Sequence, residues 1–89
     1  MKTLVLYRPN SEYGRAVDEF IHEFQVRSSG SYKIEIFNID SQEGARIAEL
    51  YGVMEYPAIL VLQSDGFLQK SWEGGILPLV EEVIAFSRA

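Results

Sequence analysis

One stretch decides the fold: Tyr51-Gly52-Val53-Met54-Glu55-Tyr56-Pro57-Ala58-Ile59-Leu60-Val61-Leu62. Gly52 follows a helical pattern, at the place where a helix often ends on a residue in the left-handed conformation. Pro57 then begins a run that is almost entirely apolar, which is typical of a strand covered on both faces. The stretch therefore predicts the end of a helix, a short loop and a buried central strand.

The residues before this stretch predict a strand and then a helix. Asp40 and Glu43 have the spacing of a capping box, with Asp in place of the usual Ser or Thr, so we expect a helix that opens at Asp40 and reaches Tyr51. Upstream, apolar and charged residues alternate from Tyr32 and predict a strand that continues to Ile39.

The first part of the chain has the same order of elements. A short run of strand formers, Leu4 to Tyr7, stops at Pro9-Asn10. Apolar residues then recur at steps of three and four and predict a one-sided helix from about Ser11 to Arg27, ended by residues 28–31. The apolar set of this helix is Tyr13, Ala16, Val17, Phe20, Ile21 and Phe24.

The last part predicts a hairpin and a helix. Ser64-Asp65-Gly66 is a hairpin turn that leads into a strand from Phe67 to Trp72, and Gly74-Gly75 breaks that strand. A last helix is expected from about Leu77, with Pro78 near its first turn. Its apolar set is Leu79, Val80, Val83, Ile84 and Phe86.

The predicted order is β-α-β-α-β-β-α, within one α/β domain that spans residues 1–89. A right-handed crossover makes the first two strands parallel neighbours, and the hairpin makes the last two antiparallel. A four-stranded mixed sheet with helices on both faces buries all of these apolar residues in the simplest way.

Composition narrows the possible functions. The chain carries a formal net charge of −5, which disfavours nucleic acid and anionic membranes as partners. It contains no cysteine and one histidine, so disulfides, thiolate metal sites and cysteine nucleophiles are excluded and a zinc centre is hard to assemble. The apolar run at Leu4–Tyr7 is too short for a signal sequence, and we expect a cytoplasmic protein without cofactor or metal.

Three stretches resemble the thioredoxin-like superfamily. Leu6 to Gly14 is similar, one residue shorter, to the glutaredoxin stretch Tyr-x-x-Pro-x-Cys-Pro-Tyr-Cys. The run from Asn38 through Tyr51-Gly52-Val53 to Tyr56-Pro57 is similar to the thioredoxin pattern of strand, helix, Tyr-Gly-Val/Ile and cis-proline. Trp72-Glu73-Gly74-Gly75 resembles the Gly-Gly that closes the glutaredoxin sheet. The resemblance implies a thioredoxin-like fold that lacks the CxxC cysteines.

The cysteine positions of the family carry other residues in this chain. In the glutaredoxin register, Ser11 replaces the nucleophilic cysteine, Glu12 the proline, Tyr13 the tyrosine and Gly14 the resolving cysteine. A serine hydroxyl does not ionise at neutral pH, and the one histidine, His22, lies roughly 16 Å further along the same helix at the usual rise per residue. We therefore expect no catalytic residue and no thiol–disulfide oxidoreductase activity. As structural roles, we expect Ser11 or Asn10 to cap the helix and Glu12 to lie in its first turn.

Recognition is the function that the resemblance leaves open. In relatives, the residue before the cis-proline exposes its backbone N–H and C=O to an extended peptide or to glutathione. The resemblance implies the same for Tyr56, with Met54 and Tyr13 as an apolar rim. The leading hypothesis is a redox-inactive module that binds a protein or peptide. Its expected site comprises Ser11, Glu12, Tyr13, Gly14, Met54, Tyr56, Pro57, Gly74 and Gly75.

Two alternatives remain at this stage. A glutathione-binding or glutathione-transferase-like enzyme would use Ser11 or Tyr7 in place of cysteine, with Arg8 or Arg15 attracting a carboxylate. A regulatory scaffold similar to the KaiB-type clock proteins would also lack cysteine. Asp18 and His22, one helical turn apart, are interpreted as part of a solvated charged face rather than as metal ligands.

Overall fold

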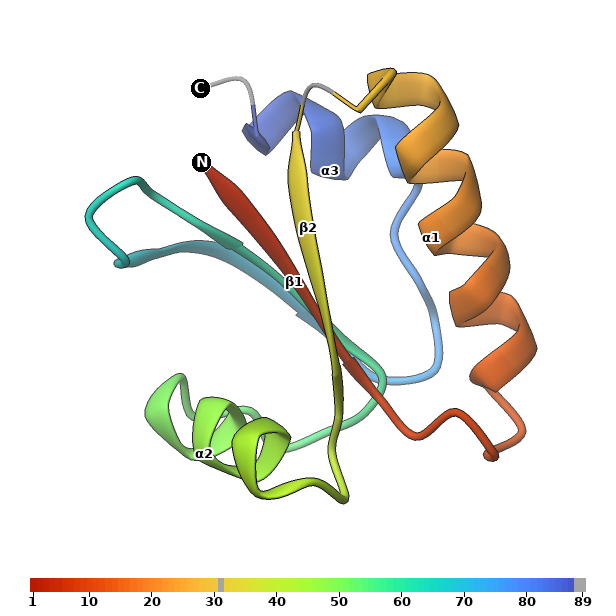
Figure 1. Cartoon of the computed structure of the whole chain (residues 1–89), viewed down its shortest axis with the longest axis vertical. Helices are drawn as coiled ribbons and strands as arrows, with labels where there is room; N and C mark the ends of the chain where they lie inside the picture. The colour runs from red at the N-terminus through yellow and green to blue at the C-terminus, as the bar shows by residue number, and fades with distance from the viewer. Residues whose placement is uncertain (31, 88–89) are drawn as a thin grey trace.

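The computed structural model describes residues 1–30 and 32–87. The elements follow the predicted order (Figure 1). They are β1 (Lys2–Tyr7), α1 (Gly14–Ser28), β2 (Lys33–Asn38), α2 (Gln42–Leu50), β3 (Ala58–Leu62), β4 (Leu68–Glu73) and α3 (Val80–Ser87). Ser31, which we expected to help end the first helix, lies outside the described residues.

The four strands form one mixed sheet in the order β2-β1-β3-β4. β1 is parallel to β2, and β3 is antiparallel to β4, which confirms the two predicted pairings. The structure adds that β1 is antiparallel to β3. Helices α1 and α3 lie on one side of the sheet and α2 lies on the other (Figure 1). The predicted four-stranded sheet with helices on both faces is therefore confirmed.

The core is divided by the two central strands. All five residues of β3 are buried, as the apolar run predicts for a strand covered on both faces. Because side chains alternate along a strand, β1 and β3 supply residues to both layers. Val5, Tyr7, Ile59 and Val61 belong to the cluster that contains the apolar residues of α1 and α3. Leu4, Leu6, Ala58, Leu60 and Leu62 belong to the cluster on the α2 side.

Two helices begin later than the apolar pattern predicts. α1 starts at Gly14 rather than near Ser11, because the amide groups of Ser11 and Gly14 donate to Arg8 and Ser11 carbonyls in successive turns. α3 starts at Val80 rather than near Leu77. Leu79, assigned to the core of that helix, is 67% exposed because it precedes the first helical turn.

The start of α2 corrects the predicted capping box. Ser41, not Asp40, is the N-cap residue, and its hydroxyl oxygen accepts from the Gly44 amide at 2.9 Å. The C-terminus is as predicted: Gly52 has a φ of +67°. The Gly52 and Val53 amides donate to the carbonyls of Glu49 and Ala48, which is a Schellman motif.

Within residues 1–30 and 32–87, no helix has both the length and the apolar character that crossing a membrane requires.

Candidate binding site

The loop after β1 and the loop before β3 meet at one end of the sheet. They meet because β1 and β3 are antiparallel neighbours and Leu6 pairs with Ala58. Between the loops lies a cleft of about 320 Å³, which we call the Pro57 cleft. It is lined by Tyr7, Arg8, Ser11, Glu12, Tyr13, Ile39, Met54, Glu55, Tyr56 and Pro57.

The structure brings together six of the nine residues that the sequence assigns to the site. These are Ser11, Glu12, Tyr13, Met54, Tyr56 and Pro57. The remaining three residues, Gly14, Gly74 and Gly75, do not line the cleft but lie close to residues that do. The Gly74 amide donates to the Pro57 carbonyl at 3.0 Å. Gly75 lies under the Tyr13 ring, where an added Cβ would come within 2.7 Å of the phenol oxygen.

Ser11 and Glu12 have different structural roles from those expected. The Ser11 hydroxyl donates to the Arg8 carbonyl at 2.6 Å and caps no helix. Tyr13 occupies the N-cap position of α1 and makes no side-chain capping bond, so Asn10 does not cap the helix either. Glu12 precedes α1, and the first turn of the helix contains no acidic residue. Both residues lie outside the helix because two successive turns, from Arg8 to Ser11 and from Ser11 to Gly14, precede the first helical residue.

At Gly14 the chain passes close to its own backbone at Pro9. An ideal Cβ built at this position would lie 2.0 Å from the Pro9 carbonyl oxygen. The obstacle is backbone, which cannot rotate away as the end of a side chain can. The position that corresponds to the resolving cysteine therefore has no room for any side chain unless the loop moves.

Arg8 is held in an ion pair at the edge of the cleft. Its guanidinium donates to both carboxylate oxygens of Asp40, at 2.9 and 3.0 Å. These hydrogen bonds lower the pKa of Asp40 and raise that of Arg8. Arg8 is the one cationic side chain among the residues that line the cleft. Its charge is therefore already compensated within the protein.

Tyr7 forms the floor of the cleft and is 7% exposed. Its hydroxyl donates to the Asp18 carboxylate at 2.6 Å. Burial raises the pKa of Tyr7 to about 12, and the hydrogen bond to Asp18 adds to the effect. The phenol is thus neutral at physiological pH, and its proton is directed toward α1 rather than into the cleft.

Glu73 supports the loop before β3, a role that we did not predict. Its Oε1 accepts from the Met54 amide at 2.6 Å and from the Glu55 amide at 3.3 Å. Glu73 pairs with Ala58 across β3 and β4. The register shifts by one residue between Val61 and Leu62, so counting from the hairpin turn would have placed Trp72 opposite Ala58, and no local signal identifies Glu73.

Tyr56 is half-buried and lines the cleft, and its peptide bond to Pro57 is cis. Among residues 1–30 and 32–87, neither the Tyr56 N–H nor its C=O has a hydrogen-bond partner within the protein. Buried peptide groups are almost always paired, so an unpaired donor and an unpaired acceptor on a residue that lines a cleft are candidate contacts for a ligand.

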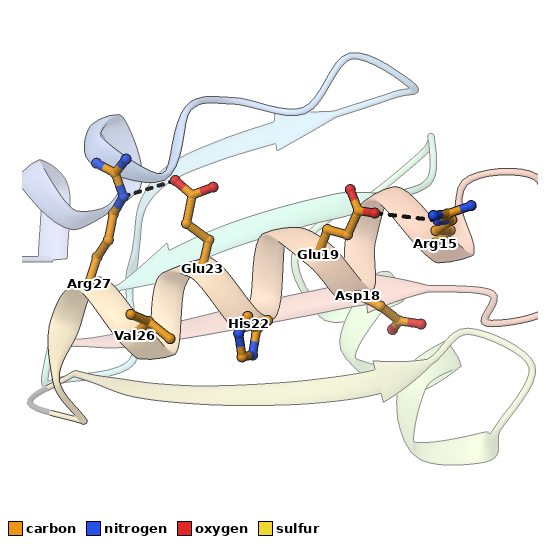
Figure 2. A pocket seen from close by; sticks show the side chains of 7 residues that line it. All are labelled: Arg15, Asp18, Glu19, His22, Glu23, Val26 and Arg27. Atoms are coloured by element: carbon orange, nitrogen blue, oxygen red, sulfur yellow. Dashed lines mark hydrogen bonds and ion pairs between the residues drawn. The ribbon is translucent and has the colours of Figure 1, made fainter.

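A larger hollow of about 620 Å³ runs along the outer face of α1. Figure 2 shows that its seven lining side chains all come from this one helix, with ion pairs between Arg27 and Glu23 and between Arg15 and Glu19. Asp18 and His22 lie on the same exposed face. In the described part of the chain, no three His, Asp or Glu side chains are grouped so that they could hold a metal ion. We interpret this surface as a charged helix face.

Comparisons with known proteins agree with the architecture. The sequence matches no protein-family model and no curated protein. The structure is similar to that of a malarial protein, with a TM-score of 0.76 and 13% identity over 98% of this chain and 92% of that one. It is also similar to thioredoxin 1 of Thermosipho africanus, with a TM-score of 0.72 and 16% identity over 99% and 92% of the two chains.

A third similar structure is the germline-specific thioredoxin Deadhead of Drosophila melanogaster. The TM-score is 0.73 and the identity 14%, over 96% of this chain and 75% of Deadhead. At these identities the likeness concerns the fold. The chain has the thioredoxin-like fold that its sequence predicts, and it has that fold without a cysteine.

Proposed function

We propose that this chain is a redox-inactive thioredoxin-like domain that binds an extended protein or peptide segment at the Pro57 cleft. The observation that carries the proposal is the unpartnered backbone of Tyr56 within the described residues, at the side of an open cleft. An extended segment can satisfy one N–H and one C=O together by pairing as a short added strand.

The surroundings of Tyr56 suit such a partner. The Met54 side chain is 84% exposed and that of Tyr13 is 38% exposed, and both line the same cleft. Methionine adapts to irregular apolar surfaces, and tyrosine is enriched among residues that dominate binding energy. The backbone of Tyr56 would give affinity without sequence preference, and these two side chains would add apolar contact.

The cysteine positions support the redox-inactive part of the proposal. Thiol–disulfide exchange needs an attacking thiolate, and this chain has none. The close approach of Gly14 to the Pro9 carbonyl shows that the loop is built around the absence of a side chain there.

The glutathione-handling alternative has less support from the same residues. Stabilising a thiolate by hydrogen bonding requires a hydroxyl hydrogen that points at the ligand. The Ser11 hydroxyl donates to the Arg8 carbonyl, and the Tyr7 hydroxyl donates to Asp18. Arg8, the cation that would attract a carboxylate, is occupied by Asp40. No comparable observation favours the KaiB-type alternative.

A peptide selection tests the proposed function directly. Random peptides would be selected on the purified protein, and the tightest would be titrated into isotope-labelled protein. We expect saturable chemical-shift changes at the amides of Met54, Glu55, Tyr56 and Ala58. Met54→Ser should weaken binding by about tenfold or more, because it removes the apolar contact without adding a charge to the cleft. Since Met54 is largely exposed, this variant should remain folded.

The matched control is Leu50→Ser, which makes the same kind of change at an exposed apolar residue outside the cleft. It should bind the selected peptides as the wild type does. Equal loss in both variants, or shifts that map away from Met54–Ala58, would count against the proposal. Glutathione at millimolar concentration should produce no saturable shift, and saturable binding in the cleft would favour the glutathione alternative instead.

A further inference from the structure

We infer that the segment bound at the Pro57 cleft is basic, with Lys or Arg side chains next to apolar ones. This inference rests on the proposed function and specifies the partner by its charge. It follows from two observations. The cation at the cleft is paired with a carboxylate of the protein, whereas two carboxylates at the cleft are, within the described part of the chain, not paired with a cation.

The positive charge at the cleft is paired within the protein. Arg8 donates to both oxygens of Asp40, with N–O distances of 2.9 and 3.0 Å. This bidentate pair orients the guanidinium and uses two of its five N–H donors. An acidic partner could reach only the remaining donors, and it would be repelled there by the Asp40 carboxylate.

The negative charge at the cleft is not compensated in this way. Glu12 and Glu55 line the cleft and are exposed, and within the described residues neither takes part in an ion pair. Glu55 extends toward Gly74, where its Oε2 is 3.9 Å from the position of an added Cβ. Glu73, whose carboxylate holds the loop amides, adds a third negative charge beside them.

Exposed apolar side chains lie at the same end of the sheet. Met54 and Tyr13 line the cleft. Ile76 is 93% exposed and directly follows Gly75, which lies against the Tyr13 ring. Side chains of an extended segment alternate in direction, so one segment can present both apolar and basic groups. Complementary charge steers such a segment to the cleft and excludes acidic competitors.

Three synthetic peptides test the charge preference. Each is an acetylated, amidated octamer that alternates valine with one other residue: lysine, serine or glutamate. Binding to isotope-labelled protein is followed at the Met54, Glu55, Tyr56 and Ala58 amides. We expect the lysine peptide to bind about tenfold more tightly than the serine peptide, and the glutamate peptide to bind weakest. The difference should fall at high salt, which screens exposed charges.

Paired charge variants locate the preference. Glu12→Lys with Glu55→Lys should reverse the order, so that the glutamate peptide binds more tightly than the lysine peptide. Glu19→Lys with Glu49→Lys changes the net charge equally, outside the cleft, and should keep the original order. Both proteins should first be shown to unfold cooperatively, like the wild type.

The outcomes separate the two claims. If lysine, serine and glutamate peptides bind the cleft equally, or if both double variants change the order alike, the charge inference is wrong and peptide binding stands. If the lysine peptide does not bind where a selected peptide does, the charge inference is also wrong. If no selected peptide binds the cleft either, the proposed function fails with it.

Discussion

At Gly14 the structure adds a steric constraint to the absence of cysteine. The sequence alone indicates that a thiol is missing at positions 11 and 14. The structure adds that an atom at the Cβ position of Gly14 would lie 2.0 Å from the Pro9 carbonyl oxygen. The loop in its present geometry therefore has no space for a cysteine side chain at position 14.

Restoring both cysteines tests this residue-scale account. Relative to Ser11→Cys alone, Ser11→Cys with Gly14→Cys should lower the free energy of unfolding by about 2 kcal/mol or more, because the new side chain meets backbone. Urea unfolding under reducing conditions measures the difference. The double variant should also fail to reduce insulin disulfides. A double variant as stable as Ser11→Cys that reduces insulin would show that the loop opens readily.

Other residues of the site could be predicted only in part. The resemblance places Ser11, Tyr13, Met54 and Tyr56 at one end of the sheet, and the cleft contains all four. The roles of Arg8 and Glu73 depend on side-chain partners that are distant in sequence, Asp40 and the loop amides. No local pattern specifies such pairs, because each requires the register of several strands to be known.

At the scale of elements, the ends of α2 show what local sequence can specify. The C-terminus was predictable because Gly52 has a backbone conformation that few other residues adopt. The N-terminus was not, because Asp40 and Ser41 are both good capping residues and stand side by side. Tertiary structure decides between them. The Asp40 carboxylate accepts hydrogen bonds from Arg8, and the Ser41 hydroxyl oxygen accepts one from the Gly44 amide.

Alanine substitutions distinguish the two caps. Ser41→Ala should lower the free energy of unfolding by about 1 kcal/mol, the usual cost of losing an N-cap hydrogen bond. Asp40→Ala removes only an exposed ion pair with Arg8 and should lower the free energy of unfolding by less than Ser41→Ala does. Chemical denaturation of the two variants in parallel measures both values. A larger loss in Asp40→Ala than in Ser41→Ala would mean that Asp40 is the effective cap.

The starts of α1 and α3 illustrate the limit of hydrophobic periodicity. Both helices begin later than their apolar pattern, at Gly14 and Val80. Periodicity locates the residues that face the core, but it does not distinguish a first helical turn from a series of tight turns with similar spacing. At α1 this difference matters for function, because the turns place Ser11 and Glu12 on the cleft rather than in the helix.

For the whole molecule, the order of elements predicted two of the three strand pairings. Glycine, proline and asparagine mark the ends of the elements, the right-handed crossover makes β1 and β2 parallel neighbours, and the hairpin makes β3 and β4 antiparallel. The order alone did not specify the antiparallel pairing of β1 with β3, which joins the two halves of the sheet. The buried residues of β3 confirm the prediction that the apolar run is the centre of the fold. The pairing of β1 with β3 brings the loops after β1 and before β3 together, so the position of the cleft is a consequence of topology.

The central claim is that Tyr56 pairs with a partner through its main chain. A scan of N-methylated versions of a selected peptide tests it most directly, because each methyl group removes one backbone N–H. We predict that methylation at one position, the residue whose N–H meets the Tyr56 carbonyl, weakens binding by about tenfold or more, while methylation of its two neighbours leaves the Kd unchanged. Equal affinity for every methylated peptide would contradict the claim.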